Sequence, residues 1–177
     1  MKKVLVLFCS KNLNGKTAKL LNFYLKKLKL NFLDDVSLKF ISSYNVKILP
    51  CDVCNLCSSN GGCVFNFKDD FLNLVHEVQS ADIFVLASNV FFSGLPAHVK
   101  AFIDRCEQFY LEKLRQRGAP LILKLGYFVL TGGNLDKLSF MAILNCVKQF
   151  FWCLNINFES VIVAPKTDVS DLFFLVK

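Results

Sequence analysis

Four cysteines in the stretch "PCDVCNLCSSNGGC" carry the strongest chemical signal in the sequence. They follow the spacing C-x2-C-x2-C-x5-C, and they are Cys51, Cys54, Cys57 and Cys63. Three thiols so close together in one loop can converge on a compact multi-iron cluster, and the fourth can close it. The spacing is similar to the [4Fe–4S] runs of bacterial ferredoxins, which have three residues, not five, before the fourth cysteine.

Zinc and metal-free thiols are the alternatives for this array. Four cysteines also bind zinc tetrahedrally, but structural zinc sites commonly use two separated C-x2-C pairs. Eight cysteines without a secretion signal favour metal or redox chemistry over a disulfide scaffold. The other four cysteines lie in strand or helix patterns and are predicted to be buried structural thiols: Cys9, Cys106, Cys146 and Cys153.

A second candidate site is the loop "SKNLNGKT" at 10–17, between an apolar run and a helical pattern. It ends in G-K-T like a P-loop, but Ser10 stands where a Walker A loop needs its first glycine. The apolar run at 81–88 also ends without the Asp that would hold Mg²⁺, so an NTPase is disfavoured. Such a loop still suits a monophosphate, because its N–H groups and the helix N-terminus point at the anion. An ordinary turn capped by Asn14 or Thr17 is the simpler alternative.

Strand-like and helix-like segments alternate along the whole chain, and they must position these residues. The predicted strands are 3–9, 36–40, 81–88, 121–131 and 158–164, and the predicted helices are 16–28, 69–78, 97–118 and 136–153. The tail at 168–177 is expected to form a short helix, and Asp104 and Arg105 an ion pair on a helix face. We therefore expect one α/β domain over 1–177, a doubly wound five-stranded parallel sheet of order 2-1-3-4-5 with helices on both faces.

Composition narrows the function classes. The net charge is +7 and the mean hydropathy +0.43, but no apolar run approaches the ~18 residues that span a membrane. The lysines are dispersed, which disfavours nucleic acid, although a basic surface can attract an acidic protein partner. The apolar segment of "MKKVLVLFCS" is too short for a secretion signal, so a cytoplasmic protein is expected.

In this sheet order, ligands bind where the strand order reverses, at the carboxyl ends of strands one and three. FMN occupies that place in flavodoxin-like folds. The loop after 81–88 offers an apolar platform at Phe91 and Phe92, with polar groups at Asn89 and Ser93. The alternative is that these phenylalanines only belong to the core of a Phe-rich chain. The cysteine loop, at about 50–67, follows the second strand and leaves the same edge.

Three segments together resemble the NAD(P)H-dependent FMN reductase and iron–sulfur flavoprotein family. "CSKNLNGKTAKL" is similar to its phosphate loop G-S-P-R-x-N-G-N-T, and "ADIFVLASNVFFSGLPAHVKAFIDR" is similar to its second signature. "TGG" at 131–133 resembles its third flavin-side loop. The cysteine spacing matches the compact motif of iron–sulfur flavoproteins, with a Pro before the first Cys and an acidic pair, Asp69 and Asp70, after the last.

The resemblance implies which residues contact FMN. At the phosphate loop they are Ser10, Asn12, Asn14, Gly15, Lys16 and Thr17. Along the isoalloxazine ring they are Ser88, Asn89, Val90, Phe91, Phe92, Ser93 and Gly94, with Thr131, Gly132 and Gly133 opposite. Asn89 replaces the usual Pro and Phe91 the usual Tyr, so we expect flavin binding to be kept and its redox potential to differ.

The resemblance also implies an electron-transfer function. FMN would exchange electrons with a [4Fe–4S] cluster on the four cysteines, in the same subunit or a neighbouring one. The donor would be a ferredoxin-like protein or NAD(P)H, and the chain would form a homo-oligomer, a dimer or tetramer. The alternatives are a cluster-free NAD(P)H-dependent FMN or quinone reductase, and a non-catalytic redox carrier or zinc/flavin sensor module.

Overall fold

In a computed structural model of the chain, residues 1–30, 35–115, 124–168 and 172–176 are described. The parallel strands are β1 (Lys2–Cys9), β2 (Val36–Ser42), β3 (Ile83–Asn89), β4 (Lys124–Thr131) and β5 (Ile156–Ala164). They lie in the order β2-β1-β3-β4-β5, which confirms the predicted doubly wound sheet. Residues 121–123 of the predicted fourth strand lie outside the described residues.

A sixth strand, β6 (Phe174–Val176), extends the sheet beyond the five that were predicted. It pairs antiparallel with β5, with Val176 opposite Val161. The prediction of a helix in the tail is therefore wrong for these residues, while 169–171 and 177 lie outside the described residues. A three-residue apolar segment cannot sustain a helix, but it can satisfy its backbone on the open edge of β5.

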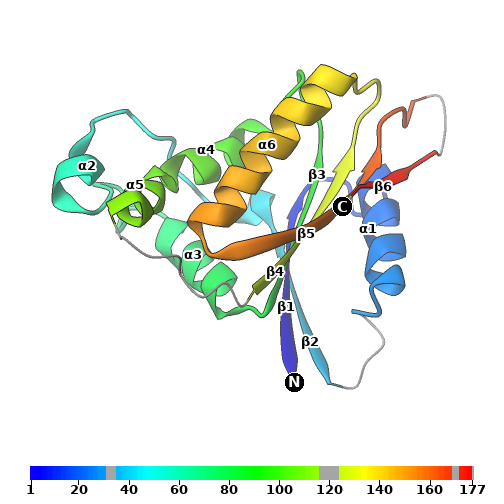
Figure 1. The fold of residues 1–177 in the computed structure, drawn as a ribbon, viewed down its shortest axis with the longest axis horizontal. Helices are drawn as coiled ribbons and strands as arrows, with labels where there is room; N and C mark the ends of the chain where they lie inside the picture. The colour runs from blue at the N-terminus through cyan, green and yellow to red at the C-terminus, as the bar shows by residue number, and fades with distance from the viewer. Residues whose placement is uncertain (31–34, 116–123, 169–171, 177) are drawn as a thin grey trace.

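Helices cover both faces of the sheet, as predicted (Figure 1). On one face lie α3 (Phe71–Ser80), α4 (Ala97–Arg105) and α6 (Lys137–Cys153), and on the other lies α1 (Lys16–Lys27). The remaining helical elements are η1 (Ser43–Asn45), α2 (Leu56–Asn60) and α5 (Glu107–Arg115). None of the helices in the described part of the chain is long and apolar enough to cross a membrane.

The helix predicted over 97–118 is two helices, α4 and α5, with a break at Cys106. The N–H of Cys106 donates to the carbonyl of Ile103 at 3.0 Å, an i−3 bond that tightens the last turn of α4. The helical spacing of apolar residues continues across the break, so periodicity alone does not reveal it. Residues 116–118 lie outside the described residues.

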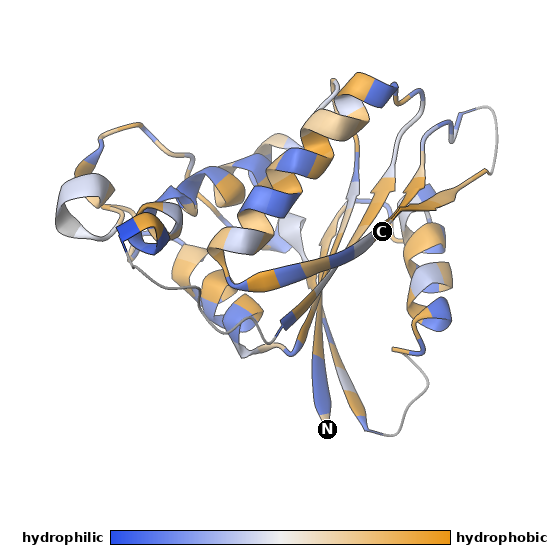
Figure 2. Cartoon of the chain, in the orientation of Figure 1, coloured by the Kyte–Doolittle hydropathy of each residue, from blue (hydrophilic) through white to orange (hydrophobic). Residues whose placement is uncertain are grey.

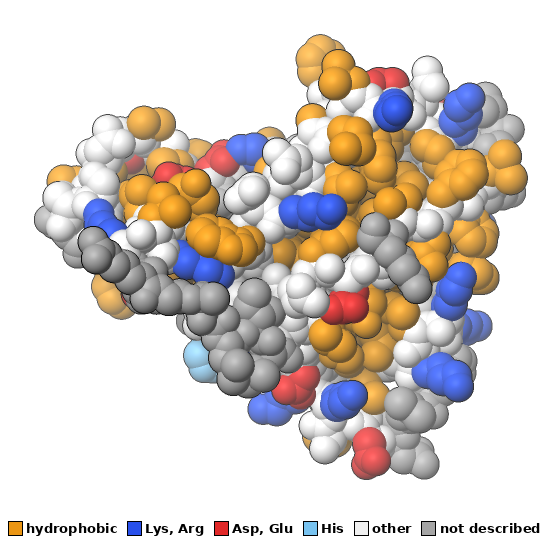
Figure 3. Space-filling model, in the orientation of Figure 1, with side chains coloured by type: hydrophobic (Ala, Val, Ile, Leu, Met, Phe, Trp, Pro, Cys, Tyr) orange, Lys and Arg blue, Asp and Glu red, His pale blue; other side chains and the backbone are white. Residues whose placement is uncertain are grey.

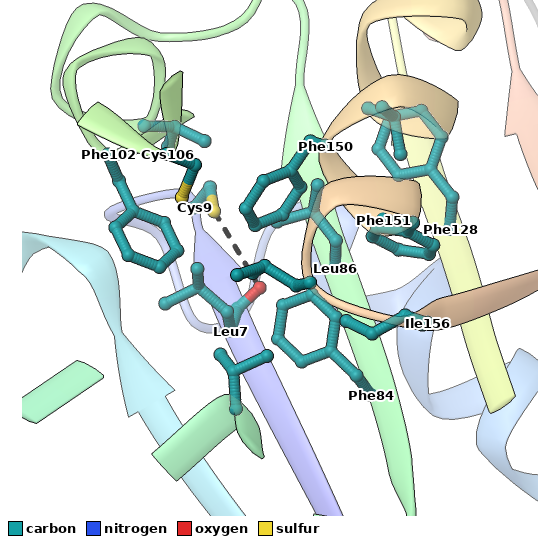
Figure 4. Packing of buried hydrophobic residues seen from close by; sticks show 14 of the residues in the cluster. Leu7, Cys9, Phe84, Leu86, Phe102, Cys106, Phe128, Phe150, Phe151 and Ile156 are labelled. Carbon is teal, nitrogen blue, oxygen red and sulfur yellow. Dashed lines mark hydrogen bonds between the residues drawn. The ribbon is translucent and has the colours of Figure 1, made fainter. Parts of the chain in front are cut away.

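Two apolar cores flank the sheet, because successive side chains of a buried strand point to opposite faces. In β1, Leu5 and Leu7 face the larger core, whereas Val6 and Phe8 face the core under α1. Apolar residues dominate the central strands (Figure 2). Aromatic rings fill the larger core, with centroids 5.5 Å apart for Phe84–Phe151 and for Phe102–Phe150 (Figure 4). Cys9, Cys106 and Cys153 are buried, as predicted, whereas Cys146 is half-buried.

Candidate functional site

The loop between β1 and α1 is curled by its own amide groups. The N–H of Asn14 donates to Oδ1 of Asn12 at 2.9 Å, and the N–H of Gly15 donates to the carbonyl of Asn12 at 3.2 Å. A Cβ on Gly15 would lie 3.2 Å from that carbonyl oxygen, so the turn favours glycine. Gly15 is the N-cap of α1, so the helix has no N-cap side chain, in contrast to a turn capped by Asn14 or Thr17 at that position. The first-turn N–H groups of α1 therefore lack a side-chain acceptor from the N-cap, as an anion site requires.

Thr17 lies beneath this loop and connects it to β4. Its Oγ1 lies 2.6 Å from Oγ1 of Thr131, and both side chains are buried. Two residues predicted at separate flavin-contacting loops thus share one hydrogen bond. The other predicted phosphate-loop side chains, at 10, 12, 14 and 16, lie at or near the surface.

The loop after β3 forms a tight two-residue hairpin. Phe91 and Gly94 exchange both backbone hydrogen bonds, at 2.9 Å and 2.8 Å. Phe92 and Ser93 have φ values of 44° and 59°, in the left-handed region that type I′ turns require. Phe92 is fully exposed at the tip. Non-glycine residues held in this conformation concentrate at functional sites.

Asn89 carries an unpaired buried acceptor at the carboxyl end of β3. Its Oδ1 is buried and has no hydrogen-bond partner in the described part of the protein. Its own carbonyl accepts from the hydroxyl of Ser88 at 2.9 Å, and the next N–H, of Val90, donates to the carbonyl of Thr131 at 2.8 Å. A buried acceptor without a partner is destabilising unless a ligand donates to it.

The third loop, after β4, is packed against the segment that follows β5. Gly132 donates its N–H to the carbonyl of Ala164 at 2.9 Å and accepts from the N–H of Thr167 at 2.9 Å. A Cβ on Gly133 would lie 2.2 Å from Oδ2 of Asp168. Sequence reasoning missed this contribution of 165–168, because nothing in that segment resembles a binding motif.

The second and third loops together line a cavity of about 180 Å³. Its lining residues are Val90, Phe92, Ser93, Gly132, Gly133, Asn134, Leu135 and Asp136. The structure therefore brings these two predicted loops to one place. The phosphate loop does not line this cavity; Thr17 connects it to Thr131, the residue directly before Gly132 in the cavity wall. The glycines, the cavity and the unpaired Asn89 acceptor fit a bound flavin.

All four predicted cysteine ligands line one cavity of about 370 Å³. It lies in the lobe formed by α2 and α5, which projects from the body of the molecule (Figures 1 and 3). Asp104, Glu107 and Arg105 supply charged groups to its wall. The loop is held in an unusual backbone conformation, since Val53 has a φ of 58° and Asn55 a φ of 60°. A left-handed β-branched residue is a rare feature that the surrounding structure must support.

The thiols surround the cavity without closing on a single point. No three His, Cys, Asp or Glu side chains in the described ranges are arranged to share one metal ion. The pKa of Cys57 is nevertheless raised, first by burial and also by the nearby thiols of Cys63, Cys51 and Cys54. Zinc would need each sulfur within ~2.3 Å of one ion, whereas a multi-iron group accepts sulfurs spread around it. The donor set therefore fits a cluster better than a single ion.

A buried ion pair supports the cysteine loop from below. Arg105 pairs with Asp69, and both side chains are fully buried. The predicted pair of Asp104 with Arg105 is therefore wrong: Asp104 pairs on the surface with Lys100, one turn earlier. Adjacent residues of a helix do not face each other, so two separate partners are the expected physical outcome.

Five parallel strands in this order, with the candidate loops at their carboxyl ends, define a doubly wound α/β protein of the flavodoxin-like class. A model of the family described as NADPH-dependent FMN reductase matches residues 2–152, so the chain belongs to that family. The family that these motifs predict is therefore confirmed.

Solved structures share the fold. An azoreductase from Bacillus anthracis str. Sterne has a TM-score of 0.67 and 14% identity, over 95% of this chain and 88% of its own. An FMN-dependent NADH-azoreductase from Bacillus anthracis str. Ames Ancestor, in complex with FMN, has a TM-score of 0.66 and 14% identity, over 96% of this chain and 90% of its own. At such identities the likeness concerns the fold.

Curated relatives carry the name iron-sulfur flavoprotein. One from Methanocaldococcus jannaschii is 32% identical over 72 residues, which is 41% of this chain and 36% of the relative. One from Archaeoglobus fulgidus is 37% identical over 91 residues, which is 51% of this chain and 39% of the relative. The matched segments thus span less than half the length of these relatives.

Proposed function

We propose that the protein is an FMN-dependent oxidoreductase that passes electrons from a donor such as ferredoxin or NAD(P)H to an acceptor. The observation that carries this proposal is the cavity between the second and third loops, beside the unpaired buried oxygen of Asn89, in a chain of the FMN reductase family. Bound FMN supplies the redox chemistry, so no acid–base side chain is required.

The chain's own residues bind and orient the flavin. The loop of Asn12 to Gly15 is held by its internal hydrogen bonds and leads into the first turn of α1, whose N–H groups would face the phosphate. Thr17 fixes that loop to β4 through Thr131. The unpaired Oδ1 of Asn89, at the carboxyl end of β3, would accept a hydrogen bond from the flavin. The hairpin of Phe92 and Ser93 would shield the flavin from water on the side of the cavity that it lines.

For the cysteine cavity we propose a [4Fe–4S] cluster held by Cys51, Cys54, Cys57 and Cys63. Support comes from the single cavity that all four line and from the names of the curated relatives. A cluster carries one electron at a time, which complements a flavin that takes two. Among the described residues none lines both cavities. An oligomer in which the cluster of one subunit lies near the flavin of another would join them.

The experiment is anaerobic purification and cluster reconstitution, followed by iron, zinc and FMN content per chain. About four irons with one FMN is the expected result. Cys54→Ser should lose the iron and keep the FMN, whereas the control Cys146→Ser, outside this cavity, should keep both. FMN without iron in the reconstituted wild type would refute the cluster, and absence of both would refute the flavin assignment. Light scattering of the same sample tests the dimer or tetramer.

A cluster-free NAD(P)H-dependent FMN or quinone reductase is the second candidate. It is supported by the match of residues 2–152 to the NADPH-dependent FMN reductase family. Steady NAD(P)H consumption by iron-free protein would support it. Stoichiometric zinc without turnover would instead indicate a zinc/flavin sensor module.

With an acidic ferredoxin as donor, the rate of electron transfer should fall steeply as salt is added, because screening weakens attraction to a basic surface.

A further inference from the structure

Arg105 is a buried cation whose hydrogen-bonding capacity is incompletely used. Its Nη1 contacts the carboxylate of Asp69 and lies 3.5 Å from the carbonyl of Leu49, and its Nη2 lies 3.5 Å from Oδ1 of Asn66. The guanidinium also lies over the ring of Phe71, 4.3 Å from its centroid. The Nε–H has no acceptor in the described part of the chain, although it is buried.

Arg105 is also one of the residues that line the cavity of the four cysteines. Arg105 is 2% exposed, so this unpaired donor cannot be satisfied by bulk water. Asp104 and Glu107, which also line the cavity, add negative charge to its wall. A sulfur-rich anion placed there would meet acidic neighbours, and Arg105 is the lining residue that could offset them.

Arg105 is also fixed in position by contacts that extend to both ends of the cysteine loop. Asp69 accepts the N–H of Leu49, two residues before Cys51, at 2.7 Å. Gln108 accepts the N–H of Cys63 at 3.2 Å and donates to the carbonyl of Arg105 at 3.0 Å. Arg105, Leu49 just before the first cysteine, and the last cysteine, Cys63, therefore belong to one connected hydrogen-bond network, which preorganises the site.

We propose that the Nε–H of Arg105 donates a hydrogen bond to a sulfur atom of the iron–sulfur group held by the four cysteines, and thereby raises its reduction potential. This inference rests on the proposed cluster. Hydrogen bonds to the sulfurs and nearby positive charge stabilise the reduced, more negative form of such a group. The flanking ion pair with Asp69 keeps the guanidinium charged and oriented.

The test uses full-length chain labelled with ¹⁵N-arginine and reconstituted anaerobically with iron and sulfide. Pulsed EPR of the reduced cluster should detect a coupled arginine ¹⁵N. Arg105→Lys keeps the charge but removes the Nε–H, so the coupling should vanish. One-electron reduction of the cluster should become about tenfold less favourable, which lowers its reduction potential by ~59 mV. Arg115→Lys is the matched control, because Arg115 contacts the carbonyl of Ser58 at the edge of the same cavity. It should leave the coupling and the potential unchanged.

The outcomes separate the inference from the function on which it rests. Wild-type chain that takes up no iron would overturn the cluster, and the role of Arg105 with it. Two results would overturn the role of Arg105 and leave the cluster in place. Either the iron-loaded wild type shows no arginine ¹⁵N coupling, or the coupling is removed by Arg115→Lys and not by Arg105→Lys. If Arg105→Lys does not fold, the wild-type coupling and its persistence in the double variant Arg115→Lys/Arg117→Lys still decide, because Arg105 is then the one arginine left.

Discussion

The hydrogen bond between Thr17 and Thr131 is expected to control both stability and flavin binding. It joins the first turn of α1 to the end of β4, with 2.6 Å between the two hydroxyl oxygens, and both side chains are buried. Thr17→Val or Thr131→Val leaves the remaining hydroxyl buried without its partner. Such an orphaned group costs about 1–3 kcal/mol, whereas replacing both hydroxyls by methyl groups is close to neutral.

The free energy of unfolding should therefore follow a strongly non-additive double-mutant cycle. Taking ~2 kcal/mol for each single variant and an m-value of about 2 kcal/mol per M, each midpoint in urea falls by about 1 M. The double variant Thr17→Val/Thr131→Val should unfold near the wild-type midpoint. Two additive single effects would show that the hydroxyls do not interact in the folded protein, and would refute the contact.

Flavin affinity tests the further prediction that Thr17 contacts the phosphate. A hydroxyl has one hydrogen, so Thr17 can donate to phosphate only while it accepts from Thr131. Thr17→Val should weaken FMN binding by at least tenfold, since a hydrogen bond to a charged group contributes about 1.5–3 kcal/mol. Thr131→Val should weaken it less, as measured by quenching of flavin fluorescence. Equal losses in the two variants would mean that Thr17 only positions the loop.

Three further predictions concern substitutions elsewhere. Gly126→Ala places a Cβ 2.5 Å from the buried ring of Phe151, so it should lower the free energy of unfolding in urea by about 1–3 kcal/mol through overpacking. Gly133→Ala, by contrast, meets only the exposed carboxylate of Asp168, which can rotate away, so its urea midpoint should stay near that of the wild type. Burial lowers the pKa of His98, so the unfolded chain binds the proton more readily and stability should fall as the pH drops below about 6.5. The thermal midpoint should fall between pH 8 and pH 5 in wild type and in His76→Gln, but not in His98→Gln. An equal fall in His98→Gln would contradict this prediction.

The central sheet was predictable because its signal is local. β1 and β3 are continuous apolar runs, as strands buried on both faces must be, and their alternation with helical patterns indicates parallel crossovers. The tail was not predictable, since β6 is a strand only by virtue of its pairing with β5. The break at Cys106 was hidden in the same way, because the periodicity of α4 and α5 is nearly continuous.

At the candidate sites, residue types were predictable and partners were not. The cysteine spacing indicates a common loop, and the four side chains do line one cavity. The partner of Arg105 is Asp69, 36 residues earlier, and no spacing rule connects them. The hairpin at Phe92 and Ser93 lacks the Asn-Gly signature of type I′ turns, so its strain is visible only in the structure.

Two unpaired atoms connect the two sites to the chemistry expected of them. Of the buried side-chain nitrogen and oxygen atoms in the described residues, Oδ1 of Asn89 and Nε of Arg105 lack a hydrogen-bond partner. One lies at the carboxyl end of β3 beside the flavin-side loops, and the other lies on a residue that lines the cysteine cavity. The isoalloxazine ring carries an N–H donor, which suits the acceptor, and the sulfurs of a cluster are acceptors, which suit the donor. An unpaired buried group destabilises the folded protein. Each cofactor should therefore stabilise the fold in two ways, through its own contacts and by giving the unpaired atom a hydrogen-bond partner. The thermal midpoint should therefore rise separately on loading FMN and on loading iron and sulfide, with Asn89→Leu reducing only the first increment.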